Sequence, residues 1–108
     1  METYIEFRKL VDKEFQTNRK VDSYCQKLNI SAKKLNLICH EFTDKTALEV
    51  IHDRLSNEIK KILIFEDVSL KEIAFRLNFD SQPALNKYIA SKFDCTPSEL
   101  KDKVLGSY

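Results

Sequence analysis

The chain has 108 residues, of which 43% are hydrophobic and 32% are charged, and its formal net charge is +1. This composition is too apolar for a disordered tail, and the length is that of one small domain. Because its single glycine is Gly106, the chain has no glycine-rich loop that could hold a phosphate, which excludes P-loop and dinucleotide-binding folds.

The first half of the chain is predicted to begin with two helices, over residues 4–15 and 21–28. The apolar residues of the first recur at near-helical spacing, and they are Ile5, Leu10, Val11 and Phe15. Residues 29–31 form a turn, after which Ser31 is an expected N-cap of a third helix. The inner face of this third helix is predicted to carry Leu35, Ile38 and Phe42.

The longest predicted helix follows, and it extends to about Phe65. Thr46 and Glu49 have the spacing of a capping box, in which each side chain accepts a hydrogen bond from the other residue's backbone N–H. The apolar stripe behind this box is Leu48, Val50, Ile51, Leu55, Ile59, Ile62 and Leu63. The spacing therefore predicts one long helix near the middle of the chain.

Three shorter helices are predicted in the second half. Ser69 with Glu72 forms a second capping box, which opens a short helix that ends at Leu77 before a turn over residues 78–81. The next helix is capped by Ser81 and contains Leu85, Tyr88 and Ile89. The last begins with the capping box and N-terminal proline of Thr96, Pro97 and Glu99. The prediction is thus an all-α chain of about seven helices.

The chain also repeats itself, since six of the twenty residues 31–50 are identical to residues 81–100 at an offset of 50. The identical pairs are Ser31 and Ser81, Leu35 and Leu85, Asn36 and Asn86, Asp44 and Asp94, Thr46 and Thr96, and Glu49 and Glu99. Just upstream the offset is 49, as in a duplicated unit with one inserted residue. A short helix, a tight turn and a longer helix form a helix-turn-helix, whose second helix can enter the DNA major groove.

Other features of the sequence concern location and the cysteines. The longest apolar run has four residues, which is far fewer than the roughly 20 that cross a bilayer. The N-terminal stretch METYIEF does not have the pattern of a secretory signal, so we expect a cytoplasmic protein without a membrane segment. The cysteines Cys25, Cys39 and Cys95 form no C-x-x-C pair, and we expect buried structural thiols.

Two motifs of the second half are specific. They are an S-x-K-E-I-A-x-x-L-x-F run that begins at Ser69 and a T-P-S-E run that begins at Thr96. With the residues around them, they strongly resemble the C-terminal DNA-binding domain of the AraC/XylS family of bacterial transcription regulators. The upstream stretch KLNISAKKLNLICHEFTDKTALEVIHDRLSNEIKKIL is similar to the first helix-turn-helix and linker helix of that domain.

The resemblance covers roughly residues 4–102 and implies a homeodomain-like fold that reads two successive major-groove segments. Its first helix-turn-helix subdomain is expected over residues 1–45, its linker helix over 46–65 and its second subdomain over 66–108. The two motifs themselves are expected at about 22–43 and 70–93. A helix over residues 46–65 is about 30 Å long, close to the ~34 Å between adjacent major-groove faces.

The resemblance also implies DNA contacts on the N-terminal parts of the third and sixth helices. The base-reading positions are Lys33, Asn36, Leu37, Gln82, Pro83, Asn86 and Lys87. Lysine can donate to guanine, asparagine and glutamine can pair with adenine, and leucine can pack on a thymine methyl group. Phosphate contacts are expected from Arg19, Lys20, Ser31, Lys34, Lys45 and Lys92.

The chain departs from the family pattern at several positions. Asp44, Asn78 and Asp94 stand where the family often has glycine, but these residue types tolerate a left-handed backbone, so the turns are expected to persist. Ala90 and Ser91 stand where two basic residues are frequent. We therefore expect the first helix-turn-helix to dominate the affinity for DNA.

The expected partner is double-stranded DNA, and the resemblance adds RNA polymerase and a sensor or dimerisation domain that is absent from this chain. We expect no enzymatic activity, catalytic residue, metal site or cofactor, because no nucleophile has a neighbouring base and His40 and His52 lack ligand-spaced partners. The alternative is a helical protein-interaction module that has lost DNA binding, motivated by the near-neutral net charge. An exposed apolar patch around Leu37 and Pro83 would favour it.

Overall fold

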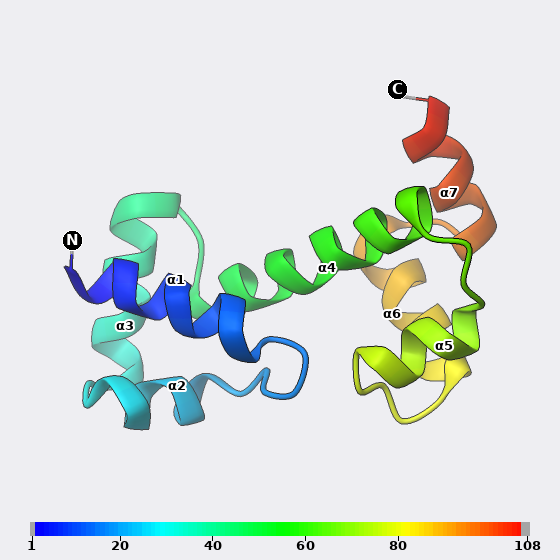
Figure 1. Ribbon diagram of the computed structural model, residues 1–108. Helices are drawn as coiled ribbons and strands as arrows, with labels where there is room; N and C mark the ends of the chain where they lie inside the picture. The colour runs from blue at the N-terminus through cyan, green and yellow to red at the C-terminus, as the bar shows by residue number, and fades with distance from the viewer. Residues whose placement is uncertain (1, 107–108) are drawn as a thin grey trace. The chain divides into compact units, whose positions relative to one another are not determined.

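The computed structural model describes residues 2–106, which contain seven α-helices and no strand (Figure 1). The helices are α1 (Glu2–Glu14), α2 (Val21–Leu28), α3 (Ala32–Thr43), α4 (Ala47–Phe65), α5 (Leu70–Arg76), α6 (Gln82–Phe93) and α7 (Pro97–Gly106). The predicted fold class and number of helices are confirmed. Among these residues, no helix has the length and apolar character that a membrane crossing requires.

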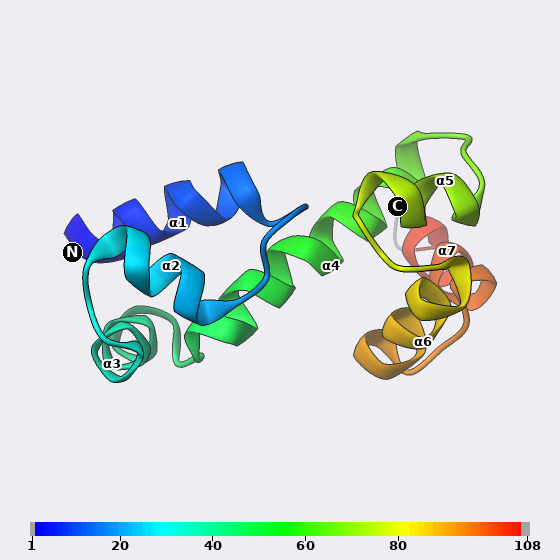
Figure 2. The same cartoon turned by 90° about the horizontal axis from the view of Figure 1, so that it is seen from below.

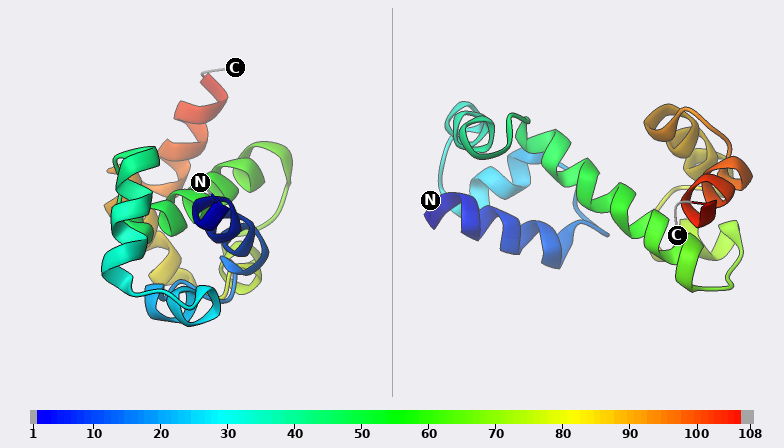
Figure 3. Two further views of the ribbon diagram at one scale, coloured as in Figure 1. Left: turned by 90° about the vertical axis from the view of Figure 1, so that its left-hand side faces the viewer. Right: turned by 90° about the horizontal axis from the view of Figure 1, so that it is seen from above.

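The chain divides into two compact units, which we call unit 1 (Met1–Leu55) and unit 2 (Ser56–Tyr108). Helix α4 is continuous and contributes residues 47–55 to unit 1 and residues 56–65 to unit 2 (Figure 3). Each unit therefore contains one short helix, one turn and one longer helix in the order predicted for a helix-turn-helix.

In unit 1, α1 packs against α2 and α3 (Figure 2). The buried residues of α1 are Phe7 and Val11, and Phe15, directly after the helix, continues their spacing of four and is also buried. The Phe7 ring meets the Tyr24 ring edge-on at 5.6 Å between centroids. The prediction that Ile5 lies on this face is wrong, since Ile5 is 44% exposed. Two residues before Phe7, it points about 200° around the helix from it, away from α2 and α3.

Two further positions of unit 1 differ from their predicted burial. Phe42 is 41% exposed, because it lies in the last turn of α3, where it stacks on Tyr4 at the edge of the core. Leu48 is 47% exposed, because the neighbouring Ala47 takes the buried position at the start of α4. The rest of the predicted α4 stripe is buried, and it comprises Val50, Ile51, Leu55, Ile59, Ile62 and Leu63.

In unit 2, α6 packs against α5 and α7. Its buried side chains are mainly aliphatic, and from α5 to α6 they include Ile73, Ala74, Leu77, Leu85 and Ile89. The aromatic residues lie toward the edge of this core, where Phe79 and Tyr88 are only partly buried and their ring centroids are 5.6 Å apart.

The helix caps follow the sequence prediction closely. In the capping box of α4, Thr46 N–H donates to Glu49 Oε1 at 3.0 Å, and Glu49 N–H donates to Thr46 Oγ1 at 3.1 Å. The box of α7 repeats this with Thr96 and Glu99 at 3.0 and 3.2 Å. Backbone N–H groups of α3, α5 and α6 donate to the Oγ of Ser31, Ser69 and Ser81.

The turns have left-handed backbone at residues other than glycine. The φ angles of Asp44, Asn78 and Asp94 are 58°, 59° and 55°, as expected for turns that persist without glycine, and Asn29 adds a fourth at 56°. Asparagine and aspartate adopt this conformation at lower cost than other residues with a Cβ atom.

The three cysteines are buried free thiols, as predicted. Burial raises the pKa of Cys39 to about 11, so this thiol stays protonated at neutral pH.

Candidate nucleic-acid interface

Each unit contains one helix-turn-helix. In unit 1 it consists of α2, a turn and α3, and in unit 2 of α5, a turn and α6. The turn contains a left-handed asparagine, Asn29 or Asn78, and ends at a serine that caps the longer helix. Serine is favoured there because its hydroxyl accepts a hydrogen bond from an N–H that the first helical turn leaves unpaired. The caps therefore stabilise the first turns of α3 and α6.

The outer face of α3 combines lysines with an apolar side chain. Lys33 and Lys34 are exposed, and Leu37, one turn later than Lys33, is 64% exposed. A shallow hollow of about 350 Å³ surrounds Leu37, lined also by Lys33, Asn36, His40 and Thr46. This face thus offers positive charge and an apolar surface together.

Asn36 has a structural contact that the sequence analysis missed. Its Oδ1 accepts a hydrogen bond from the Ala47 backbone N–H at 2.8 Å, which ties α3 to the first residue of α4. This N–H is one of those that a helix start leaves without a helical partner. The bond competes with the predicted pairing of Asn36 with adenine. No local pattern indicated it, because the two residues are 11 apart in the sequence.

The outer face of α6 exposes Gln82, Pro83 and Lys87, three of the residues predicted to read bases. The fourth, Asn86, is half-buried, and its Oδ1 is buried without a hydrogen-bond partner in the described part of the chain. The position equivalent to Ala47 is Pro97, which has no N–H to donate. Of the two equivalent asparagines, Asn36 therefore joins two helices in unit 1, whereas Asn86 lacks the corresponding donor in unit 2.

The residues predicted to contact phosphates are exposed except for Arg19, which is partly buried; the exposed ones are Lys20, Ser31, Lys34, Lys45 and Lys92. The Ser31 hydroxyl also accepts the Lys34 N–H at the start of α3. Arg19 and Lys45 have intramolecular partners: Arg19 Nη1 donates to the carbonyl oxygens of Phe15 and Gln16 at 3.0 and 2.9 Å, and Lys45 pairs with Asp53. The hydrogen bond to Asp53 raises the pKa of Lys45.

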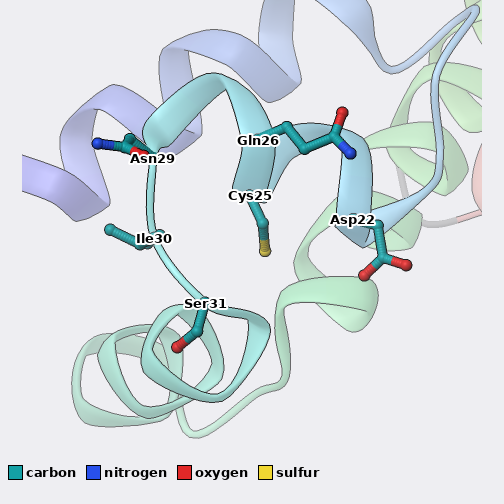
Figure 4. A pocket seen from close by; sticks show the side chains of 6 residues that line it. All are labelled: Asp22, Cys25, Gln26, Asn29, Ile30 and Ser31. Atoms are coloured by element: carbon teal, nitrogen blue, oxygen red, sulfur yellow. The ribbon is translucent and has the colours of Figure 1, made fainter.

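Each helix-turn-helix also has a hollow at its turn. In unit 1 it measures about 490 Å³, with Asp22 and Cys25 on the α2 side and Ser31 at the start of α3 (Figure 4). In unit 2 the hollow of about 430 Å³ has Lys71 at the position of Asp22, as the offset of 49 places it. Lys71 is an exposed cation near the start of α6 that the sequence analysis did not propose as a DNA contact. The internal repeat gives no signal for this residue, because its equivalent in unit 1, Asp22, is acidic.

Comparison with known proteins gives a consistent result. The sequence profile of a family described as a helix-turn-helix domain matches residues 24–103. One similar solved structure is that of the xylose-binding transcription activator xylR, with a TM-score of 0.78 and 22% identity over 94% of this chain and 27% of that one.

A second similar structure is the C-terminal domain of the two-component response regulator yesN from Fusobacterium nucleatum subsp. nucleatum ATCC 25586. Its TM-score is 0.80 with 12% identity, covering 94% of this chain and 99% of that one. No curated protein sequence matches the chain. The chain thus spans about a quarter of xylR and nearly the whole of the yesN domain.

Proposed function

Because the chain belongs to the AraC/XylS family, whose helix-turn-helix domains bind DNA in transcription regulators, we propose that it reads two successive major-groove segments of one duplex. In this proposal α3 enters one segment and α6 enters the next.

One observation carries this proposal: the chain contains two helix-turn-helix motifs with equivalent caps and turns. Each exposes a lysine on the face of its second helix, Lys33 on α3 and Lys87 on α6. The helix α4 that connects the two units has 19 residues and is therefore about 28 Å long, similar to one turn of B-DNA.

The side chains proposed to face bases are those predicted from the sequence. We place Lys33, Leu37, Gln82, Pro83 and Lys87 in this role with more weight than the two asparagines, because Asn36 is engaged by Ala47 and Asn86 is half-buried. Phosphate contacts are proposed for Ser31, Lys20, Lys34 and Lys92. For Arg19 and Lys45, such contacts require giving up an intramolecular partner.

Three further parts of the proposal rest on the family alone: a contact with RNA polymerase, a cytoplasmic location, and, where the chain acts as the output domain of a larger regulator, a separate sensor or dimerisation domain. The xylR structure is longer than this chain, which covers 27% of it.

The test is selection of a binding site from a randomised duplex pool, followed by fluorescence anisotropy between about 50 and 200 mM salt. We expect two half-sites one helical turn apart and an affinity that falls as salt rises. Insertion of about five base pairs between the half-sites turns the second to the opposite side of the duplex and reduces the affinity to that of one half-site.

Two variants rank the units in the same assay. Because α6 has Ala90 and Ser91 where the family often has two basic residues, we expect Lys33→Ala to weaken binding more than Lys87→Ala. A selected site that occupies a single groove segment contradicts two-segment reading.

A protein-interaction module is the second candidate, favoured by the exposed apolar side chains Leu37 and Phe75, which are 64% and 79% exposed. Lack of binding to any duplex at 50 mM salt would favour this candidate, since electrostatic attraction to DNA is strongest at low salt.

A further inference from the structure

The outer faces of α3 and α6 carry the same two kinds of side chain in opposite order. On α3, Lys33 is followed one turn later by the apolar Leu37, whereas the equivalent positions on α6 hold the apolar Pro83 and then Lys87. Residues four apart lie on the same side of a helix, so each pair faces one partner. All four side chains are exposed.

Building on the proposed function, we propose that the two half-sites present guanine and thymine in opposite order along the helix that reads them. From the N-terminal end of α3, Lys33 contacts a guanine and Leu37 contacts the next thymine methyl group. From the N-terminal end of α6, Pro83 contacts a thymine methyl group and Lys87 contacts the next guanine.

The surroundings of Leu37 suit a methyl group. The hollow of about 350 Å³ on the exposed side of α3 is lined by Lys33, Asn36, Leu37, His40 and Thr46. Within it, Leu37 lies one turn beyond Lys33. In the major groove the thymine methyl is the apolar group that distinguishes a base pair. A leucine that is 64% exposed loses contact with water when it packs on this methyl, which is favourable.

The hydrogen bond that Asn36 makes inside the fold supports this assignment. With its Oδ1 held by the Ala47 N–H, the bidentate pairing with adenine that an asparagine can make competes with a bond inside the fold. The lysine and the leucine on either side of it are then the side chains of this face that are available to discriminate bases.

On α6 the apolar residue, Pro83, comes first and the lysine, Lys87, follows it. Pro83 stands in the first turn of α6, where its ring is exposed and its missing N–H has no helical role. Lys87 follows one turn later, and α6 contains no acidic residue that would compete for its ammonium group. Lysine donates to the O6 and N7 acceptors of guanine.

The experiment uses the selected duplex with base analogues that each remove one functional group. Each thymine is replaced in turn by deoxyuridine, which removes only the methyl, and each guanine by 7-deazaguanine, which removes only the N7 acceptor. We expect one deoxyuridine in each half-site to weaken binding about threefold to tenfold, and one 7-deazaguanine in each to weaken it about tenfold. The order of the two sensitive positions should be opposite in the two half-sites.

Variants assign each position to its side chain. Leu37→Ala should abolish the deoxyuridine effect in one half-site and leave the effect in the other, and Pro83→Ala should do the reverse. Lys87→Met should abolish the 7-deazaguanine effect next to the thymine of Pro83. Because these side chains are exposed, the variants should fold normally, which circular dichroism checks.

The outcomes separate this inference from the proposed function. A selected two-part site without deoxyuridine sensitivity, with sensitivity that Leu37→Ala leaves unchanged, or with the same order in both half-sites overturns the inference and leaves the proposed function intact. Failure to select any site overturns the proposed function, and the inference with it.

Discussion

Units 1 and 2 have the same helix-turn-helix but fill its core with different side chains. Unit 1 buries the rings of Phe7, Phe15 and Tyr24, whereas the position of Tyr24 in unit 2 is the aliphatic Ile73. Cys39 likewise becomes Ile89. The comparison shows that the caps and the spacing of apolar residues define this fold, while the identity of most core side chains varies with the volume to be filled.

The asparagines Asn36 and Asn86 show the opposite case, in which an identical residue has different surroundings. In unit 1 the amide oxygen accepts from a backbone N–H, and in unit 2 a proline has removed that N–H. A buried oxygen without a hydrogen-bond partner is destabilising, so the same residue type contributes differently to the stability of the two units.

The largest expected effect comes from the core position that both units share. Leu35→Ala and Leu85→Ala each remove a fully buried side chain, and each should destabilise its unit by about 2 to 5 kcal/mol. In hydrogen exchange followed by mass spectrometry, Leu35→Ala should accelerate exchange in α1 to α3 and leave α5 and α6 protected. Equal acceleration in both units would show that they unfold as one and would break the comparison.

The two asparagines should differ on substitution. Asn36→Ala leaves the Ala47 N–H without its partner and should lower the free energy of unfolding by about 1 to 2 kcal/mol. Asn86→Ala should leave stability unchanged or raise it, because the oxygen that it removes has no partner. Urea denaturation measures both.

Pro97→Ala provides the matched control for this pair. It supplies a backbone N–H at the position equivalent to Ala47, so Asn86→Ala should become destabilising by about 1 kcal/mol in that background. A double-mutant cycle without coupling between residues 86 and 97 would show that the missing donor is not the cause.

The left-handed turns should respond alike in the two units. Asp44→Ala and Asp94→Ala place a residue with a poorer tolerance at φ angles of 58° and 55°, and each should lower stability by about 1 kcal/mol. Asp44→Gly and Asp94→Gly should be neutral or stabilising, since glycine has no Cβ atom to clash. Thermal denaturation of the four variants would reveal a strained turn in one unit alone if the effects differ.

The smallest expected effect is on the pH dependence of stability. Hydrogen bonds from Thr46 and Thr96 lower the pKa of Glu49 and Glu99 below the ordinary 4.5. Their contribution to stability is therefore complete above about pH 4.5 and is lost as the pH falls through the lower folded pKa. Glu49→Gln and Glu99→Gln should each flatten the decline of the urea midpoint below pH 4.5 by the same amount. A change with one variant alone would show that the two capping boxes are not equivalent.

What could be predicted from the sequence depends on how far each interaction reaches along the chain. The capping boxes of α4 and α7 and the serine caps of α3, α5 and α6 were predicted correctly, because each involves residues within one helical turn. For Ser69 and Glu72, the bond from the Glu72 N–H to the Ser69 hydroxyl is the part of the predicted box that the structure shows. The left-handed aspartates were expected from the family resemblance and are present. The exposure of Lys33, Leu37, Pro83 and Lys87 agrees with their predicted place on the outer faces of α3 and α6, and their contacts with DNA stay predictions.

The burial of individual side chains depended on packing between helices. A helix with apolar residues on several sides can bury either Ile5 or Phe7, and the contact of α1 with α2 and α3 decides for Phe7. The exposure of Leu48 has a similar origin, since Ala47 beside it takes the buried position.

The sequence by itself determined seven helices, their caps and turns, and two copies of one helix-turn-helix, since these follow from hydrogen bonds and spacing within a few residues. Only the tertiary structure decided that Asn36 binds the start of α4 and that Asn86 lacks the equivalent donor. The physical reason is that the two groups of each pair lie 11 positions apart in the sequence and meet only when the chain folds, so local propensity does not encode their contact.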